Sequence, residues 1–432
     1  MGHIHSLQGA HGDLAARLQR GPIALPEPGD PRSRRAWQDI IEILFTSDDA
    51  ALAARLPVVP ADVESLAARF GLGPDELRPR LDAMADKGLV LDLADHDGRT
   101  VYMLAPPMVG FFEFSMMRLD DGLPKARLAQ AYDAYEHGDS ALLEEISAAT
   151  AVGRTLVHEP AADDLLSEVL DWERASACVE SATSLAVTNC YCRHRAAQLD
   201  RGCQYPMEAC LSLNAAADYL VRHGFARPIG RDETLEILTT GRESGLVHIA
   251  DNVQQEITYI CSCCPCCCGE LASVRRGLPM VQPSGFQAAV DSDRCRGCGR
   301  CVRACPVLAV SLVSRGPRSA DGDGKAKLVG HVDLDICLGC GVCTGACRDH
   351  AMHMERRPQQ PYVPLNAVEH LTRRMLERGR LAELLIDGTA GRGPAFANAV
   401  LNAVLSLPPA EKLLASEQVK SRFVRYALAR VG

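Results

Sequence analysis

The placement of cysteine constrains this chain more than any other feature of its sequence. All nineteen cysteines of the 432 residues lie between Cys178 and Cys347. A secreted scaffold spreads its disulfides over a short chain, whereas thiols bunched within a long chain are typical of metal sites in a reducing compartment. The N-terminus has no basic stretch followed by an apolar run, so we expect a cytoplasmic protein without a secretory signal.

Two copies of one cysteine motif lie in residues 295–347, and both have the spacing C-x2-C-x2-C-x3-C. The first copy consists of Cys295, Cys298, Cys301 and Cys305, and the second consists of Cys337, Cys340, Cys343 and Cys347. All-cysteine zinc sites pair two C-x2-C elements and do not use a third regularly spaced cysteine in each run. The spacing instead places three thiolates on one tight loop, where the intervening glycines let backbone N–H groups approach the sulfurs.

This spacing resembles that of bacterial ferredoxins with two clusters. The resemblance implies two [4Fe–4S] clusters that exchange their fourth ligands. One cluster would be held by Cys295, Cys298, Cys301 and Cys347, and the other by Cys337, Cys340, Cys343 and Cys305. The sequence departs from the family at Arg348, where a proline usually follows the last cysteine. Because that residue is not a ligand, we expect the cluster to form.

Ten further cysteines lie between residues 190 and 268. The first group is Cys190, Cys192, Cys203 and Cys210, and the second is Cys261, Cys263, Cys264, Cys266, Cys267 and Cys268. Bare thiols at this density oxidise and cross-link readily, so we expect at least one further iron–sulfur cluster here.

The sequence leaves the ligand sets of these ten cysteines open. The first group supplies four thiols, which is enough for one cubane. In an extended second group, Cys264, Cys266 and Cys268 would face away from Cys261, Cys263 and Cys267. The second group would then share a cluster with part of the first, or form a larger cluster with shared thiolates. The last cysteine, Cys178, stands alone and is expected to be a small buried hydrophobe.

The Cys-x-Cys-Arg segment that begins at Cys190 and the Cys-Cys-x-Cys-Cys-Cys segment that begins at Cys263 precede the paired motifs. This order resembles cysteine-rich proteins of anaerobic bacteria and archaea, a resemblance that implies no particular activity. The spacing does not match the two CCG motifs of heterodisulfide-reductase-type subunits. His194 is a candidate donor to a cluster sulfide or an anionic substrate, and the alternative is a solvated helix face.

Residues 33–110 predict three helices followed by a β-hairpin. The helices are expected at Arg35–Phe45, at Asp62–Phe70 and from Pro74 to Lys87, and the strands at Leu89–Leu93 and Thr100–Leu104. This pattern resembles a winged helix. The stretch from Ser33 to Gly110 holds 8 Lys and Arg against 13 Asp and Glu, a net charge of −5. Because DNA binding needs Lys and Arg facing phosphates and base edges, we expect docking of a protein or dimerisation instead.

The whole chain is expected to be a multidomain α+β protein that is mostly helical. Its length suggests about three domains of roughly 150 residues, and its net charge of −9 argues against non-specific nucleic-acid binding. It has no run of about 18 apolar residues that could span a membrane. The predicted divisions are a flexible lead-in (1–32), a winged-helix-like domain (33–110), a helical cysteine-rich domain (111–285), a two-cluster ferredoxin domain (286–358) and a helical C-terminal region (359–432). Helical stretches are expected at Ala126–Thr150, Ala161–Ala186 and Ala367–Leu385, and an apolar helical segment at Ala395–Leu407.

These features favour an oxygen-sensitive iron–sulfur protein that passes single electrons at low potential between a redox partner protein and a second cysteine-rich site. One alternative is a redox-sensing regulator that binds DNA through the winged helix. Another is an oxidoreductase with substrate chemistry at Cys261–Cys268, which a pocket beside those residues would favour. The sequence does not identify the electron donor, the acceptor or the oligomeric state.

Overall fold

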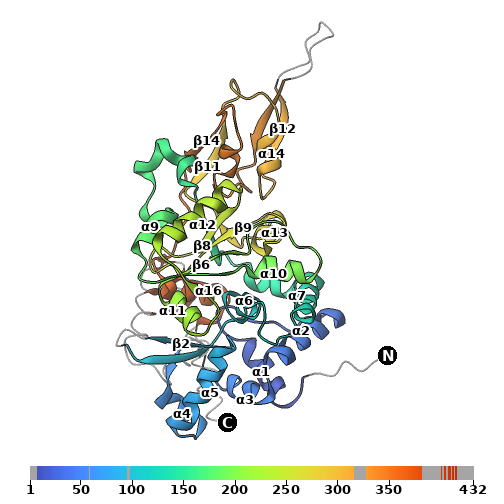
Figure 1. Cartoon of the computed structure of the whole chain (residues 1–432), viewed down its shortest axis with the longest axis vertical. Coiled ribbons are helices and arrows are strands. Elements are labelled where there is room, and N and C mark those ends of the chain that lie inside the picture. Colours follow the sequence, from blue (N-terminus) through green and yellow to red (C-terminus); the bar gives the residue numbers. More distant parts are fainter. Residues whose placement is uncertain are drawn as a thin grey trace.

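The computed structural model describes residues 7–57, 59–94, 98–315 and 327–381, and short stretches at 400, 403–404, 407–409, 411–412 and 414–415. Three parts follow one another along the long axis of the molecule (Figure 1). N-terminal helices with a small sheet form one end, a large mixed sheet with its helices lies in the middle, and residues 286–356 form the other end.

The N-terminal part contains five helices and three short strands. They are α1 (Gly9–Leu18), α2 (Pro31–Leu44), α3 (Ser47–Ala53), β1 (Ala61–Asp62), α4 (Val63–Phe70), α5 (Pro74–Asp86), β2 (Val90–Ala94) and β3 (Thr100–Leu104). The three expected helices and the hairpin are therefore present, and the strands form an antiparallel sheet in the order β1-β3-β2. The expectation of a flexible lead-in over residues 1–32 is wrong for α1, because Leu14 and Leu18 are buried in the core.

A seven-stranded sheet forms the middle part, in the order β10-β4-β8-β9-β6-β5-β7. Its strands are β4 (Gly153–Leu156), β5 (Leu185–Asn189), β6 (Glu208–Leu213), β7 (Arg227–Pro228), β8 (Val247–Asp251), β9 (Tyr259–Cys263) and β10 (Val281–Gln282). The prediction of a helical domain over residues 111–285 is therefore wrong. Most of these strands are short and largely buried, so they lack the alternation of apolar and polar residues that marks a half-exposed strand.

Helices cover this sheet and connect its strands. They are η1 (Pro107–Phe111), α6 (Phe112–Met117), α7 (Lys125–Gly138), α8 (Ala141–Ile146), η2 (Glu159–Glu168), η3 (Asp171–Glu173), α9 (Ala175–Ser181), α10 (Tyr191–Gln198), α11 (Asn214–Arg222), α12 (Arg231–Glu243) and α13 (Gly269–Arg275). The expected helix over Ala161–Ala186 is instead broken into η2, η3, α9 and the start of β5. On β9, Ser262 lies against Gly241 of α12, so Cys261 and Cys263, its neighbours along the strand, face the opposite side of the sheet.

Residues 286–358 form the α+β unit that the sequence predicts. It contains β11 (Phe286–Val290), α14 (Arg300–Ala304), β12 (Val310–Arg315), β13 (Lys327–Val332), α15 (Val342–Gly345) and β14 (Met352–Arg356). Strand β11 pairs with β14, and β12 pairs with β13, in both cases antiparallel. The first pair joins the beginning and end of the unit, which brings its two cysteine motifs together.

The C-terminal region begins with α16 (Ala367–Glu377), within the helix expected at Ala367–Leu385. Arg374 Nη1 in this helix donates to Thr150 O at 2.7 Å, which holds α16 against the middle part. Most of the apolar segment expected at Ala395–Leu407 lies outside the described residues. No helix among the residues that the structure describes has the length and apolar character needed to cross a membrane.

Candidate metal centres

Residues 286–356 contain two small hollows. Four thiols line each hollow, three from one C-x2-C-x2-C-x3-C motif and one from the other. Each hollow measures about 20 Å³. The first is lined by Cys295, Cys298, Cys301 and Cys347, and the second by Cys305, Cys337, Cys340 and Cys343. The fold therefore places the fourth cysteine of each motif beside the first three cysteines of the other, the arrangement that the ferredoxin resemblance implies.

Backbone N–H groups point at several of these sulfurs. Ala309 N donates to Cys305 Sγ at 3.2 Å, and Ala351 N donates to Cys347 Sγ at 3.3 Å. Both donors lie four residues after their cysteine, so the two halves of the unit repeat the same local geometry. Such donors favour the charged thiolate, which is the form that binds a metal.

Glycines in the two loops are required by the backbone and by close packing. Gly297 and Gly339 occupy the same position in each motif, with φ values of 65° and 69°. A Cβ atom on Gly339 would lie 2.0 Å from Phe286 O, and one on Gly297 would lie 2.4 Å from Leu328 O. Neither position can accept a side chain without movement of the backbone that it touches.

The chemistry of these thiols suits a metal cluster. Burial raises the pKa of Cys340 to about 12, so the free thiol stays protonated at neutral pH. A metal displaces such protons, because only the thiolate is a ligand. Four soft thiolate ligands around one hollow are the donor set of an iron–sulfur cluster.

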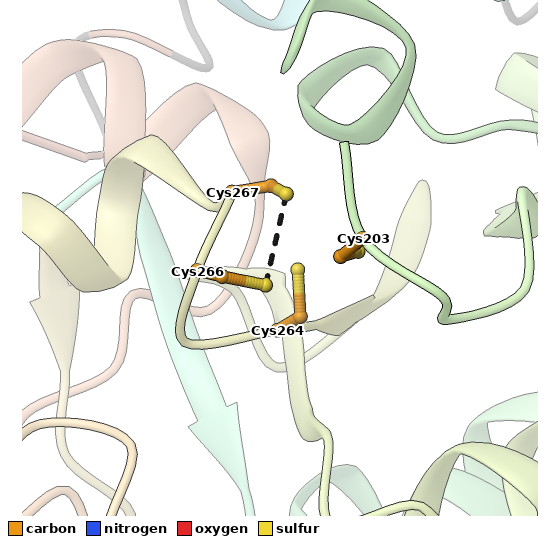
Figure 2. A group of neighbouring side chains, drawn as sticks. All are labelled: Cys203, Cys264, Cys266 and Cys267. Carbon is orange, nitrogen blue, oxygen red and sulfur yellow. Dashed lines mark hydrogen bonds between the residues drawn. The ribbon is translucent and has the colours of Figure 1, made fainter. Parts of the chain in front are cut away.

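A second group of four thiols lies in the middle part of the molecule. The Sγ atoms of Cys203, Cys264, Cys266 and Cys267 all lie within 4.8 Å of one another, and we refer to them as the four-thiol group. Figure 2 shows Cys264, Cys266 and Cys267 on one turn and Cys203 on a separate segment opposite them. Cys266 is exposed, so this group reaches the surface.

The other six of the ten thiols between Cys190 and Cys268 form a closed ring. Each lies within hydrogen-bonding reach of two others, and Cys210 and Cys261 lie 3.7 Å apart across the paired strands β6 and β9. In order, the six-thiol ring consists of Cys190, Cys192, Cys268, Cys263, Cys261 and Cys210. Contact with Cys192, together with burial, raises the pKa of Cys268 to about 12.

This grouping agrees with one arrangement left open from the sequence, in which the second cysteine group shares a site with part of the first. Cys203 joins the second cysteine group, while Cys190, Cys192 and Cys210 join the ring, so the first group does not supply one set of four thiols. The expected alternation from Cys261 to Cys268 holds only along β9, which ends at Cys263. A turn follows and α13 begins after Cys268, so Cys268 returns to the ring and Cys267 does not.

The residues around the thiols have defined roles. Arg193 Nη2 donates to Ser262 O at 2.6 Å, and the guanidinium also contacts the Cys264 thiol. His194 was expected to contact a cluster or to lie on a solvated face, and both alternatives are wrong. It is buried, and its Nδ1 lies 2.7 Å from Met116 O. Cys178 is buried away from both thiol sets, as expected, and contacts Trp172 O.

The structure also places two carboxyl groups beside the ring that the sequence gave no reason to select. One Glu270 carboxylate oxygen lies within 4.8 Å of the Cys263 and Cys268 thiols. Glu113 on α6 lines the same cavity as the ring, and burial raises its pKa to about 7. Their only sequence signal is the position of Glu270 two residues after Cys268; Glu113 is 77 residues from the nearest of the ring cysteines.

Helix α13 connects the six-thiol ring to the hollows of residues 286–356. Cys268 precedes its first residue, and Arg275 Nη1 at its last residue donates to Pro306 O, next to Cys305. Seven helical residues span about 10 Å. Further hydrogen bonds join the two parts, among them the one from His158 N to Cys340 O at 3.0 Å and the one from Arg356 Nη1 to Glu168 O at 2.8 Å.

Comparison with known families supports the assignment of one of these sites. Residues 294–351 match the family model described as a 4Fe–4S dicluster domain, and the match includes both cysteine motifs. The chain thus contains an iron–sulfur domain. The search of curated proteins found no match to the chain.

Proposed function

We propose that this protein transfers electrons between two [4Fe–4S] clusters in residues 295–347 and a second iron–sulfur centre built from Cys190–Cys268. The observation that carries this proposal is the position of α13, which links the six-thiol ring to Cys305 within one short helix. A short separation favours electron transfer, because its rate falls steeply with distance.

We refer to residues 286–356 as the dicluster unit, and its two hollows supply the proposed ligand set of each cluster. The first cluster would be held by Cys295, Cys298, Cys301 and Cys347, and the second by Cys337, Cys340, Cys343 and Cys305. Such clusters exchange one electron at a time at a potential set by charge, exposure and hydrogen bonds to sulfur. The donors Ala309 N and Ala351 N supply such hydrogen bonds.

The ten thiols of the middle part would hold two further centres. The four-thiol group supplies the ligands of one cubane. The six-thiol ring has two more thiols than one cubane uses, which favours a larger cluster with shared ligands. Of the nineteen cysteines, Cys266 and Cys298 are exposed, so electrons would enter and leave through the four-thiol group and the first cluster of the dicluster unit.

We propose a redox partner protein as the source or acceptor of these electrons. The N-terminal part, which we interpret as a winged-helix-like domain, is proposed to dock a protein. Its helix α5 presents Asp75 and Glu76 as exposed side chains, which suits a basic protein surface more than DNA.

Iron and sulfide content of the full-length protein, purified and reconstituted without oxygen, tests the proposal. The dicluster unit accounts for about eight irons, the four-thiol group for about four more, and the ring for at least four, so we expect about sixteen or more. Cys203→Ala should remove about four irons, and Cys210→Ala should remove the iron of the ring. Cys178→Ala, a buried cysteine outside both sets, should change nothing.

A content of about eight irons, with zinc but no further sulfide, would confine electron transfer to the dicluster unit. It would also leave the ten thiols of the middle part as a structural zinc site.

A second candidate function is an oxidoreductase with its substrate beside the six-thiol ring. The observation that favours it is a large cavity, of about 340 Å³, whose wall contains all six ring thiols. A pure electron carrier needs no such space beside its cluster.

A further inference from the structure

The cavity beside the six-thiol ring extends well beyond the thiols. From the ring it continues to Leu91 and Leu93 of β2, to Met108 and Val109 of η1, and along α6, α8 and α11. Its volume is about 340 Å³, whereas a cavity of about 150 Å³ in another protein holds benzene. The wall therefore surrounds more space than the thiol end occupies, and the far end is contributed by the N-terminal part.

The wall selects against negatively charged ligands. Most of its side chains are apolar, and its charged side chains are Glu113, Glu136, Glu270 and Arg195. Arg195 Nη1 donates to Glu136 Oε1 at 2.5 Å, so this cation is already neutralised. Thiolates and carboxyl groups then face the cavity without a free positive partner among the described residues of the wall. An anion that entered would lose its hydration without gaining a free cationic partner there.

Glu113 is held at the wall by an unusual piece of backbone. Gly110 N donates to Glu113 Oε2 at 3.0 Å, and the preceding Val109 has φ 54° and ψ 44°. A β-branched residue in the left-handed region is a strained conformation that the surrounding structure must maintain. Strain of this kind is concentrated at ligand sites. Here the strained residue precedes the glycine whose N–H group positions the carboxyl group of Glu113 on α6.

The carboxyl group of Glu113 is suited to donate a hydrogen bond. Burial raises its pKa to about 7, so a neutral acid with an O–H donor is present below that pH. The other ionisable groups that act on Glu113 are Glu136 and Tyr132 on α7, Tyr191 on α10 and Glu270 on α13. None of these groups carries a positive charge, so none of them favours the ionised form of Glu113.

We propose that this cavity binds an uncharged, mainly apolar small molecule with one acceptor oxygen, and that Glu113 donates a hydrogen bond to that oxygen beside the six-thiol ring. This inference rests on the proposed function, because the ring carries the metal centre that gives the site a redox role. It identifies the class of molecule that such a centre would meet.

Binding of cyclohexanone, a ketone that does not alkylate thiols, to the full-length, anaerobically reconstituted protein tests the proposal, with cyclohexanecarboxylate as an anionic probe of similar size. Calorimetry measures affinity, and the paramagnetic resonance spectrum of the reduced protein reports whether the probe lies near the ring. We expect saturable binding of the ketone, at least tenfold weaker binding of the carboxylate, and a change in the spectrum. Leu93→Trp should abolish binding by filling the far end, without loss of iron.

Variants of Glu113 separate its role from a merely structural one. Binding of cyclohexanone to the wild type should weaken as pH rises from 6 to 8, because ionised Glu113 cannot donate. Glu113→Gln keeps a donor and should bind without this pH dependence, Glu113→Leu should bind at least tenfold more weakly, and Glu42→Leu, an exposed position on α2, should match the wild type.

Two failures are distinguishable. If iron and sulfide show a loaded ring but cyclohexanone does not bind saturably, or Glu113→Gln retains the wild-type pH profile, this inference is overturned and electron transfer stands. If the ring carries no cluster, the proposed function itself fails for that site.

Discussion

Arg275 Nη1 donates a hydrogen bond to Pro306 O at 3.0 Å, across 31 residues of sequence. Arg275 ends the helix that begins after Cys268 of the six-thiol ring, and Pro306 follows Cys305 of the second dicluster hollow. One short helix and the hydrogen bond at its end thus lie between two candidate redox centres.

The first prediction concerns this contact. Arg275→Ala should leave the iron content unchanged but slow electron transfer between the dicluster unit and the ring, because the end of α13 is then no longer held against the carbonyl group next to Cys305. Stopped-flow absorbance after reduction by dithionite would measure the rate. Arg276→Ala is the matched control, since its exposed side chain lies on the same helix end. Equal rates for both variants would show that the contact does not set the transfer distance.

The second prediction concerns the exchanged ligands. Cys305→Ala should remove the cluster held mainly by the second motif, because Cys305 lines the hollow of Cys337, Cys340 and Cys343. Cys298→Ala, a cysteine of the same motif that lines the other hollow, should remove the first cluster instead. Paramagnetic resonance of the reduced variants distinguishes the two clusters. The crossed assignment is wrong if both variants lose the same one.

The third prediction concerns a loop glycine. Gly339→Ala should destabilise the dicluster unit by about 1–3 kcal/mol and lower its iron content, because φ is 69° there and a Cβ would meet Phe286 O. Gly345→Ala on α15 has open space around the new Cβ and is expected to behave as the wild type. Thermal unfolding under anaerobic conditions, with iron determination, compares the two. A stable, fully loaded Gly339→Ala would contradict the geometry.

The fourth prediction concerns DNA. The holo protein should show no appreciable binding to duplex DNA even at low salt, where phosphate contacts are strongest. The acidic side chains of α5 also have partners within the protein: Asp86 contacts His223 Nδ1 at 2.7 Å, and Asp82 accepts from Tyr102 at 2.8 Å. Gel shift and fluorescence anisotropy would measure the affinity of the holo protein for duplex DNA. Sub-micromolar, sequence-selective binding would favour the redox-sensing regulator instead.

The fifth prediction concerns pH. Burial lowers the pKa of His370 to about 4, and its Nε2 lies 2.9 Å from Ala151 O. Between pH 6.5 and 4 the unfolded chain binds a proton that folded His370 does not, so stability falls as pH falls in this window. From pH 6.5 to 5 the loss from this residue is at most about 2 kcal/mol.

The variant His370→Gln should be less stable than the wild type at pH 7 but should lose less stability on acidification. Urea unfolding at pH 7 and at pH 5 measures the free energy of unfolding of each variant. His353→Gln, at an exposed position, is the control. An unchanged pH dependence in His370→Gln would mean that another group is responsible.

Much of the dicluster unit could be predicted because its ligands are local in sequence. Three cysteines of each motif lie within seven residues, and the spacing alone sets the loop that carries them. The α+β character of residues 286–358 and the helices and hairpin of the N-terminal part were predicted for a similar reason, since caps, glycines and apolar periodicity act over short distances.

The middle part was predicted poorly because its organisation is long-range. Strand pairing of β6 with β9 brings Cys210 to Cys261 across 51 residues, and no local pattern encodes that pairing. Most of the short strands of the seven-stranded sheet are largely buried and carry no alternation, so the sequence does not predict this sheet. The ligand sets stayed open for the same reason.

The sequence by itself determined that cysteine chemistry governs this protein, that residues 295–347 carry two repeated cysteine motifs, and that ten further thiols must be brought together. Local spacing is sufficient for those conclusions. Only the tertiary structure decided that the ten thiols divide into four and six, that Glu113 lies in the wall of a cavity beside the six, and that α13 connects them to Cys305. The reason is that sheet pairing and helix packing, which act between distant residues, fix which side chains share one space.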